Sequence, residues 1–117
     1  MSYMQEQIAA VVRKSNETSQ AWCATLESTT QSENWIQITG QQLNLYYPCP
    51  DPPESKLATI QIPQGVSVLD WESDLFVTLN YDSNQIDVTA AFLERYIENV
   101  LQDVPSDSRW TSTIEMA

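Results

Sequence analysis

Three acidic residues occupy every second position of one short segment: Asp70, Glu72 and Asp74, with Trp71 between the first two. In an extended chain, side chains two positions apart point to the same side, so the three carboxylates would share one face. Carboxylate pairs catalyse hydrolysis, and clustered carboxylate oxygens bind hard cations such as Ca²⁺. However, the central glycine and closing glutamate of an EF-hand loop are missing, and an exposed acidic loop has the same composition. A carboxylate- or cation-dependent enzyme is therefore an alternative rather than the main prediction.

Histidine, the side chain most used for proton transfer near neutral pH, is absent from the chain. Ser-His-Asp and Cys-His catalysis and histidine metal sites are thereby excluded. The two glycines, Gly40 and Gly65, are isolated, which excludes a glycine-rich phosphate loop. Cys23 and Cys49 lack Cys-x-x-C spacing, and we expect both to be reduced and packed, although their spacing leaves open whether they meet. We predict no enzyme activity, no cofactor, and no catalytic or metal-binding residue.

Aromatic residues are the better candidates for binding another molecule. Tyr46 and Tyr47 are adjacent in a segment that alternates like a strand, so their side chains must face opposite sides. Tyrosine and tryptophan are favoured at the centres of protein interfaces, which makes an exposed Tyr46 the first choice for a contact residue. The alternative is that the following proline-rich segment shields it. The predicted protein-contact residues are Tyr46, Trp71, Asp70, Glu72 and Asp74.

The charge of the chain limits its partners. Sixteen acidic residues against five basic ones give a net charge of −11, and the basic residues are scattered. Such a surface repels phosphate backbones and anionic membranes, so we expect neither nucleic-acid nor membrane binding. No apolar run is long enough to span a bilayer and no signal-peptide pattern is present, which favours a cytoplasmic protein. An acidic inhibitor or nucleic-acid mimic is a further alternative, and the neighbouring Glu94 and Glu98 can either meet a basic partner or simply aid solubility.

Helices are expected near both ends of the chain. Ser2 and Gln5 have the spacing of a capping box, and apolar residues then recur at helical spacing. We favour a first helix that continues to Leu26 over the competing interpretation of a strand at residues 21–26. The last helix is predicted to start at Asp87 and to end before Pro105. Its apolar stripe consists of Phe92, Leu93, Tyr96, Ile97, Val100 and Leu101.

Alternating segments between the helices indicate strands. Residues 35–39 and 42–47 alternate on either side of Gly40, which predicts a hairpin, and Leu75–Tyr81 is the strongest single strand. Residues 57–62 are also predicted to form a strand, ended by Pro63. The four prolines within residues 48–53 indicate a stiff surface spacer.

These elements predict one α+β domain over residues 1–105, followed by a polar C-terminal tail at residues 106–117. The domain would contain an antiparallel sheet of three to five strands, covered on one side by the N-terminal and C-terminal helices in an α-β-β-β-α layout.

The order of elements formed by Met4–Val12, Trp35–Tyr47, Leu75–Tyr81 and Ala90–Leu101 resembles that of type III secretion chaperone-like folds. Proteins with that fold are often small, acidic, cytoplasmic, dimeric and non-enzymatic. The low lysine and high glutamine content is also similar to that of small cyanobacterial proteins. The resemblance implies a chaperone-like or protein-binding module that has a protein partner and can form a homodimer. The proline-rich segment at residues 48–53 departs from the pattern of that fold.

Overall fold

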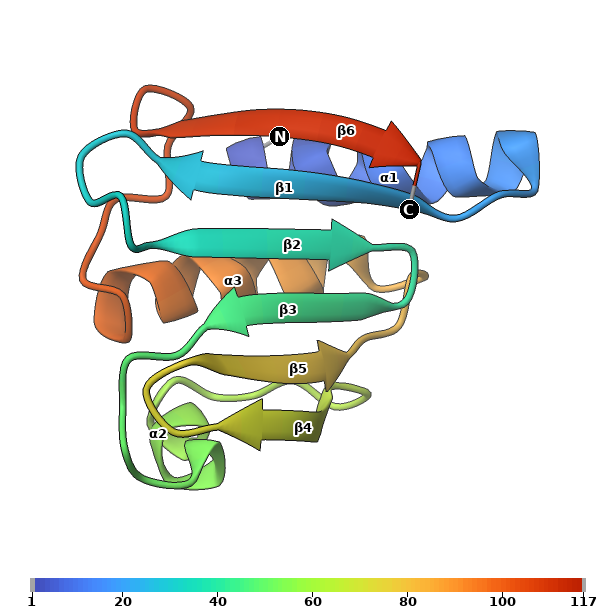
Figure 1. The fold of residues 1–117 in the computed structure, drawn as a ribbon. Coiled ribbons are helices and arrows are strands. Elements are labelled where there is room, and N and C mark those ends of the chain that lie inside the picture. Colours follow the sequence, from blue (N-terminus) through green and yellow to red (C-terminus); the bar gives the residue numbers. More distant parts are fainter. Residues whose placement is uncertain (1, 117) are drawn as a thin grey trace.

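The computed structural model describes residues 2–116, which fold into three helices and a six-stranded antiparallel sheet (Figure 1). The strands lie in the order β4-β5-β3-β2-β1-β6, so β4 and β6 are the two edges. The elements in chain order are α1 (Tyr3–Thr18), β1 (Trp22–Ser28), β2 (Trp35–Thr39), β3 (Gln42–Tyr46), α2 (Pro53–Thr59), β4 (Ser67–Glu72), β5 (Phe76–Asn80), α3 (Ile86–Asn99) and β6 (Trp110–Met116).

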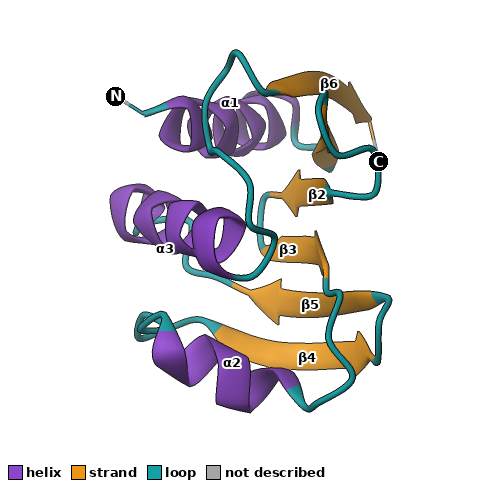
Figure 2. Cartoon of the chain, turned by 90° about the vertical axis from the view of Figure 1, so that its left-hand side faces the viewer, coloured by secondary structure: helices purple, strands orange, loops and turns teal. Residues whose placement is uncertain are grey.

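All three helices lie on the same face of the sheet, as Figure 2 shows, and the opposite face is left uncovered. In the four inner strands, β1, β2, β3 and β5, every second residue points to the helices and is buried, as expected for a sheet with one dry face. The helices contribute a further part of the core, and connecting segments add buried residues such as Tyr47 and Tyr81. The largest fully buried side chains are Tyr47, Tyr96, Phe92, Met4, Ile8, Leu26, Ile36, Ile38, Leu43, Leu45, Leu57 and Leu79. The predicted α+β class and the covering of one face by α1 and α3 are confirmed.

The first helix is shorter than predicted. Its N-cap is Ser2, whose hydroxyl accepts a hydrogen bond from the Gln5 N–H at 3.2 Å, but the helix ends at Thr18. The favoured extension to Leu26 is wrong, because residues 22–28 form β1. That strand pairs with a neighbour on each side, and two ladders of backbone hydrogen bonds outweigh the continuation of one helix. Trp22 folds back onto α1 and donates to the Thr18 hydroxyl at 2.8 Å.

The hairpin of β2 and β3 is confirmed, but the predicted number of strands is too low and the predicted order of elements is incomplete. Six strands are present rather than three to five, and the order of elements is α-βββ-α-ββ-α-β. Residues 106–117 were predicted to form a polar tail, yet β6 lies there and pairs with β1 over seven positions. The segment is polar because β6 is an edge strand with one side exposed to solvent. The buried ring of Trp110 anchors it to the core.

The segment after the prolines is a helix rather than a strand. α2 begins at Pro53, where the missing N–H of proline costs nothing because a first-turn N–H has no partner inside a helix. Leu57, predicted to lie in a strand, is instead buried on the inner side of α2. A run of only six residues is too short for its apolar spacing to distinguish a strand from a helix. The strand predicted at residues 57–62 is wrong, because α2 continues to Thr59 and residues 60–62 lie in no strand.

Deprotonation of buried tyrosines is expected to unfold the protein at alkaline pH. Burial raises the pKa of Tyr47 to about 12, with lesser contributions from Cys49 and Asp51. Burial also raises the pKa of Tyr81 and of Tyr96, whose hydroxyl groups donate to backbone carbonyls. Because the pKa of unfolded tyrosine is about 10, this stabilisation is complete below about pH 10 and is lost as the pH rises through the folded values. Circular dichroism against pH should therefore show unfolding above about pH 10, with a shallower transition in Tyr96→Phe. Unfolding that begins near neutral pH would contradict this prediction.

Candidate functional site

The uncovered face of the sheet, which we call the open face, displays the side chains that alternate with the core residues. Facing the viewer in Figure 1, it spans all six strands without a covering helix. The strand register aligns its side chains in rows that run across the strands. The fold thereby brings together residues that are far apart in the sequence.

One of these rows is aromatic. Tyr46 on β3 lies opposite Phe76 on β5, and the register of β2 with β3 places Trp35 beside Tyr46. The ring centroids of Trp35 and Tyr46 are 6.4 Å apart with a tilt of 40°. All three side chains are half-buried, so each presents part of its ring to solvent. We call Trp35, Tyr46 and Phe76 the aromatic row.

Acidic residues stand at both ends of the aromatic row. Glu27 on β1 lies opposite Trp35, and Glu72 on β4 lies opposite Phe76. Both glutamates are exposed. The row therefore reads carboxylate, three aromatic rings, carboxylate across five adjacent strands.

A row of hydrogen-bonded polar side chains lies directly beside the aromatic row. The Thr78 hydroxyl donates to Asn44 Oδ1 at 3.0 Å, and Asn44 Nδ2 donates to Gln37 Oε1 at 3.2 Å. These bonds connect β5, β3 and β2 and fix the orientation of each side chain. A shallow hollow of about 330 Å³ lies between the two rows, and Leu75, an exposed residue, completes its rim. The floor of this hollow is mostly apolar and is preorganised.

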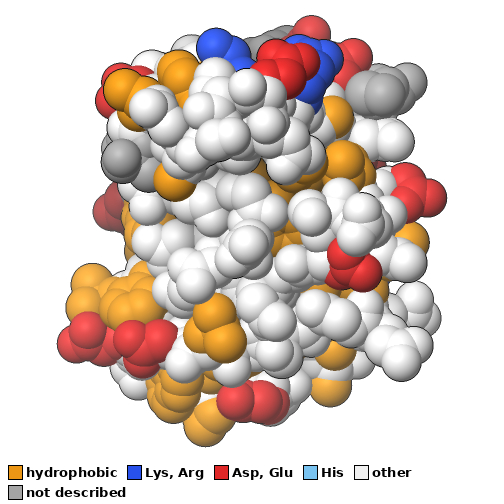
Figure 3. Space-filling model, turned by 90° about the vertical axis from the view of Figure 1, so that its right-hand side faces the viewer, with side chains coloured by type: hydrophobic (Ala, Val, Ile, Leu, Met, Phe, Trp, Pro, Cys, Tyr) orange, Lys and Arg blue, Asp and Glu red, His pale blue; other side chains and the backbone are white. Residues whose placement is uncertain are grey.

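The open face carries negative charge only. None of the six strands contains a lysine or arginine, whereas four carboxylates point from the strands to the open face: Glu27, Asp70, Glu72 and Glu115. The five basic residues belong to the helices and to the loop before β6. Figure 3, viewed along the strands, shows Lys and Arg side chains near the α1 edge and acidic side chains beside hydrophobic ones toward the β4 edge. The fold thus separates positive charge from the open face.

The structure brings three of the five predicted contact residues onto this face. Tyr46 lies at the centre of the aromatic row, and Asp70 and Glu72 lie on the open side of β4. Trp71 points the other way, opposite Val77, because neighbours in a strand alternate. Its ring contacts the buried Tyr47 edge-on, with centroids 6.5 Å apart.

Asp74 does not join the other acidic residues. It sits in the turn between β4 and β5 with a positive φ of 61°, and its N–H donates to the Cys49 carbonyl at 3.0 Å. The strand that would have aligned three carboxylates ends at Glu72. The side-by-side arrangement expected for Asp70, Glu72 and Asp74 is therefore wrong for the third residue.

Sequence reasoning did not single out Trp35, Phe76 and Glu27, which the structure places in the aromatic row or at its end. The signal was present for the first two, because each directly precedes a core position of its strand and must face outward. Glu27 gave no such signal, since the favoured helix was predicted to end at Leu26 and no strand was predicted to include Glu27. No local pattern reveals that the three belong to one row, which depends on the pairing of distant strands.

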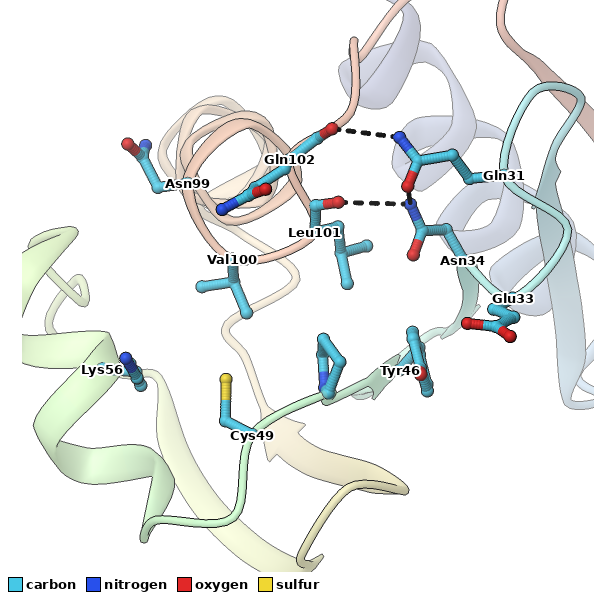
Figure 4. A pocket seen from close by; sticks show the side chains of 11 residues that line it. Gln31, Glu33, Asn34, Tyr46, Cys49, Lys56, Asn99, Val100, Leu101 and Gln102 are labelled. Atoms are coloured by element: carbon cyan, nitrogen blue, oxygen red, sulfur yellow. Dashed lines mark hydrogen bonds between the residues drawn. The ribbon is translucent and has the colours of Figure 1, made fainter.

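A second hollow, of about 360 Å³, lies at the end of the sheet between the β1–β2 loop, α2 and the end of α3 (Figure 4). Its walls are rich in amide side chains that already donate to the backbone. Gln31 donates to the Gln102 carbonyl at 3.1 Å and Asn34 to the Leu101 carbonyl at 3.3 Å. Cys49, a free and half-buried thiol, also lines the hollow. The paired amides give this hollow a structural role in joining α3 to the loop.

Within residues 2–116, no three histidine, cysteine or acidic side chains are grouped so as to hold a metal ion. Over the same range, no helix combines the length and apolarity that crossing a membrane requires. The sequence matches no protein-family model, no curated protein and no solved structure. The geometry of the open face is therefore the basis for a functional assignment.

Proposed function

We propose that this protein is a non-catalytic protein-binding module that docks a partner on its open face. The observation that carries the proposal is the aromatic row, three part-exposed rings on adjacent strands of the one sheet face that no helix covers. The lack of histidine in the sequence supports the non-catalytic part.

Aromatic side chains favour binding because they offer a large contact area at a small entropic cost. A few such residues contribute most of the binding free energy in typical interfaces. The hydrogen-bonded row of Gln37, Asn44 and Thr78 keeps the neighbouring surface rigid. Little conformational entropy of these side chains is therefore lost on binding. The shallow hollow of about 330 Å³ can accept a side chain of the partner.

A chaperone-like role in the cytoplasm, as the sequence resemblance implies, is one form of this proposal. Such a role would require the open face to hold a segment of a partner chain. The aromatic row suits an extended segment better than a small molecule, because the hollow beside it is open and shallow.

A photoreactive amino acid placed on the open face is expected to crosslink to a protein partner. Gln42 is a suitable position, since it is exposed, lies on the same side of β3 as Tyr46 and is outside the hydrogen-bonded row. Glu98, exposed on α3, is the matched control on the helical side. Crosslinked species should form in cells of the source organism from position 42 and not from position 98. Equal crosslinking from both positions, or none from position 42, would contradict the proposed function.

A further inference from the structure

We infer that the partner segment is a basic, extended polypeptide whose two cationic side chains pair with Glu27 and Glu72 at the ends of the aromatic row. This inference rests on the proposed function and adds the chemistry of the partner to it. Its basis is the arrangement of charge and aromatic rings on the open face.

Charge complementarity determines the sign of the charge on the partner segment. The open face presents four carboxylates and its strands contain no basic residue. This charge would repel an acidic or phosphate-bearing ligand, whereas it would attract a basic segment at long range, before the two surfaces meet. A second copy of this chain does not meet the requirement, because two open faces brought together would oppose carboxylates with carboxylates.

The register determines the spacing of the cations. From Glu27 on β1 to Glu72 on β4 there are four steps between adjacent strands. At about 4.8 Å per step, the two positions are about 19 Å apart. An extended peptide advances about 3.3 Å per residue, so six residues cover about 20 Å. Because six is even, both cations would point to the same side of the bound segment.

The aromatic row determines what lies between the cations. Side chains at the second and fourth positions after the first cation also point toward the sheet and would rest on the rings of Trp35, Tyr46 and Phe76. Apolar residues at these two positions would bury their surface there. Arginine suits the ends particularly well, since its guanidinium group can stack on an aromatic ring while it pairs with a carboxylate.

Titration with short synthetic peptides tests this inference. The probe is a labelled heptapeptide, Arg-Thr-Leu-Thr-Leu-Thr-Arg, blocked at both termini, and the readout is fluorescence anisotropy with the full chain. A peptide with glutamine at both ends removes the charge, and Arg-Arg-Thr-Leu-Thr-Leu-Thr keeps the charge but not the spacing. We expect the first peptide to bind about tenfold more tightly than the glutamine peptide and about threefold more tightly than the clustered one, with the preference reduced at high salt.

Two double variants assign the preference to the proposed residues. Glu27→Gln with Glu72→Gln should bring the arginine and glutamine peptides to equal affinity, whereas the control Glu94→Gln with Glu98→Gln, which removes the same charge from α3, should leave the preference intact. Equal affinities for the wild type, a preference that survives in the first variant, or no binding of any peptide would overturn the inference. Self-association of the wild type that Trp35→Ala abolishes would overturn it as well, because the open face would then hold a second copy. Crosslinking from position 42 combined with equal peptide affinities would reject the basic partner and retain the docking surface.

Discussion

Replacing Trp35 with alanine is expected to weaken binding of the protein partner about thirtyfold, equivalent to about 2 kcal/mol. Trp35 is the largest ring of the aromatic row, it is half-buried against Tyr46, and it stands next to Glu27. Truncation removes the contact area and leaves the adjacent carboxylate without its neighbouring ring. Crosslinking at position 42 would identify the partner. Isothermal titration calorimetry with that partner in purified form would then measure the loss of affinity.

Two further variants separate binding from stability. Trp35→Phe keeps an aromatic ring and should retain most of the affinity. Tyr3→Ala removes a half-buried ring from α1 on the helical side and should leave the affinity unchanged. Circular dichroism must show that each variant is folded under the conditions of the titration. If Trp35→Ala and Tyr3→Ala bind the partner equally well, the aromatic row is not the docking surface.

Replacing Asp103 with alanine is expected to destabilise the fold by about 3 kcal/mol. This carboxylate is only 7% exposed and joins the α3–β6 connection to the β1–β2 loop. It accepts hydrogen bonds from the Ser28 hydroxyl at 2.7 Å, Asn34 Nδ2 at 3.1 Å and the Val104 N–H at 2.8 Å. Alanine would leave buried donors without this acceptor. Urea unfolding at neutral pH would measure the change, and Asp107→Ala, an exposed acid in the same connection, should have almost no effect.

The same residue makes the fold sensitive to acid. Burial by itself raises the pKa of Asp103, but the hydrogen bonds from Ser28, Asn34 and Val104, together with the nearby Arg109, outweigh it and lower the pKa overall. Because the folded pKa lies below the unfolded one, the stabilisation is present above about pH 4 and is lost as the pH falls through the folded value. Asp103→Asn should therefore show a smaller loss of stability on acidification than the wild type. An equal loss of stability in the wild type and in Asp103→Asn would show that protonation of Asp103 does not cause the acid sensitivity.

Local patterns predicted the elements whose stability is local. The N-cap of α1, the β2–β3 hairpin, the strand before Tyr81 and the apolar stripe of α3 were all visible, because capping, alternation and helical spacing operate over a few residues. The outward direction of Tyr46 followed from the same alternation. The errors lie at β1, α2 and β6, and the structures of β1 and β6 are fixed by a partner far away in the chain. β1 forms between β2 and β6, and β6 pairs with a strand more than eighty residues before it.

The sequence by itself determined that the chain is acidic, lacks histidine and carries enough aromatic and apolar residues for one α+β domain with helices on one side. Only the tertiary structure decided which aromatic residues become neighbours. Trp35, Tyr46 and Phe76 lie on three different strands, and the glutamates at their ends come from two more. The physical reason is that the row runs perpendicular to the chain direction. It exists only once antiparallel pairing has fixed the register, and a shift of one residue would turn the rings into the core.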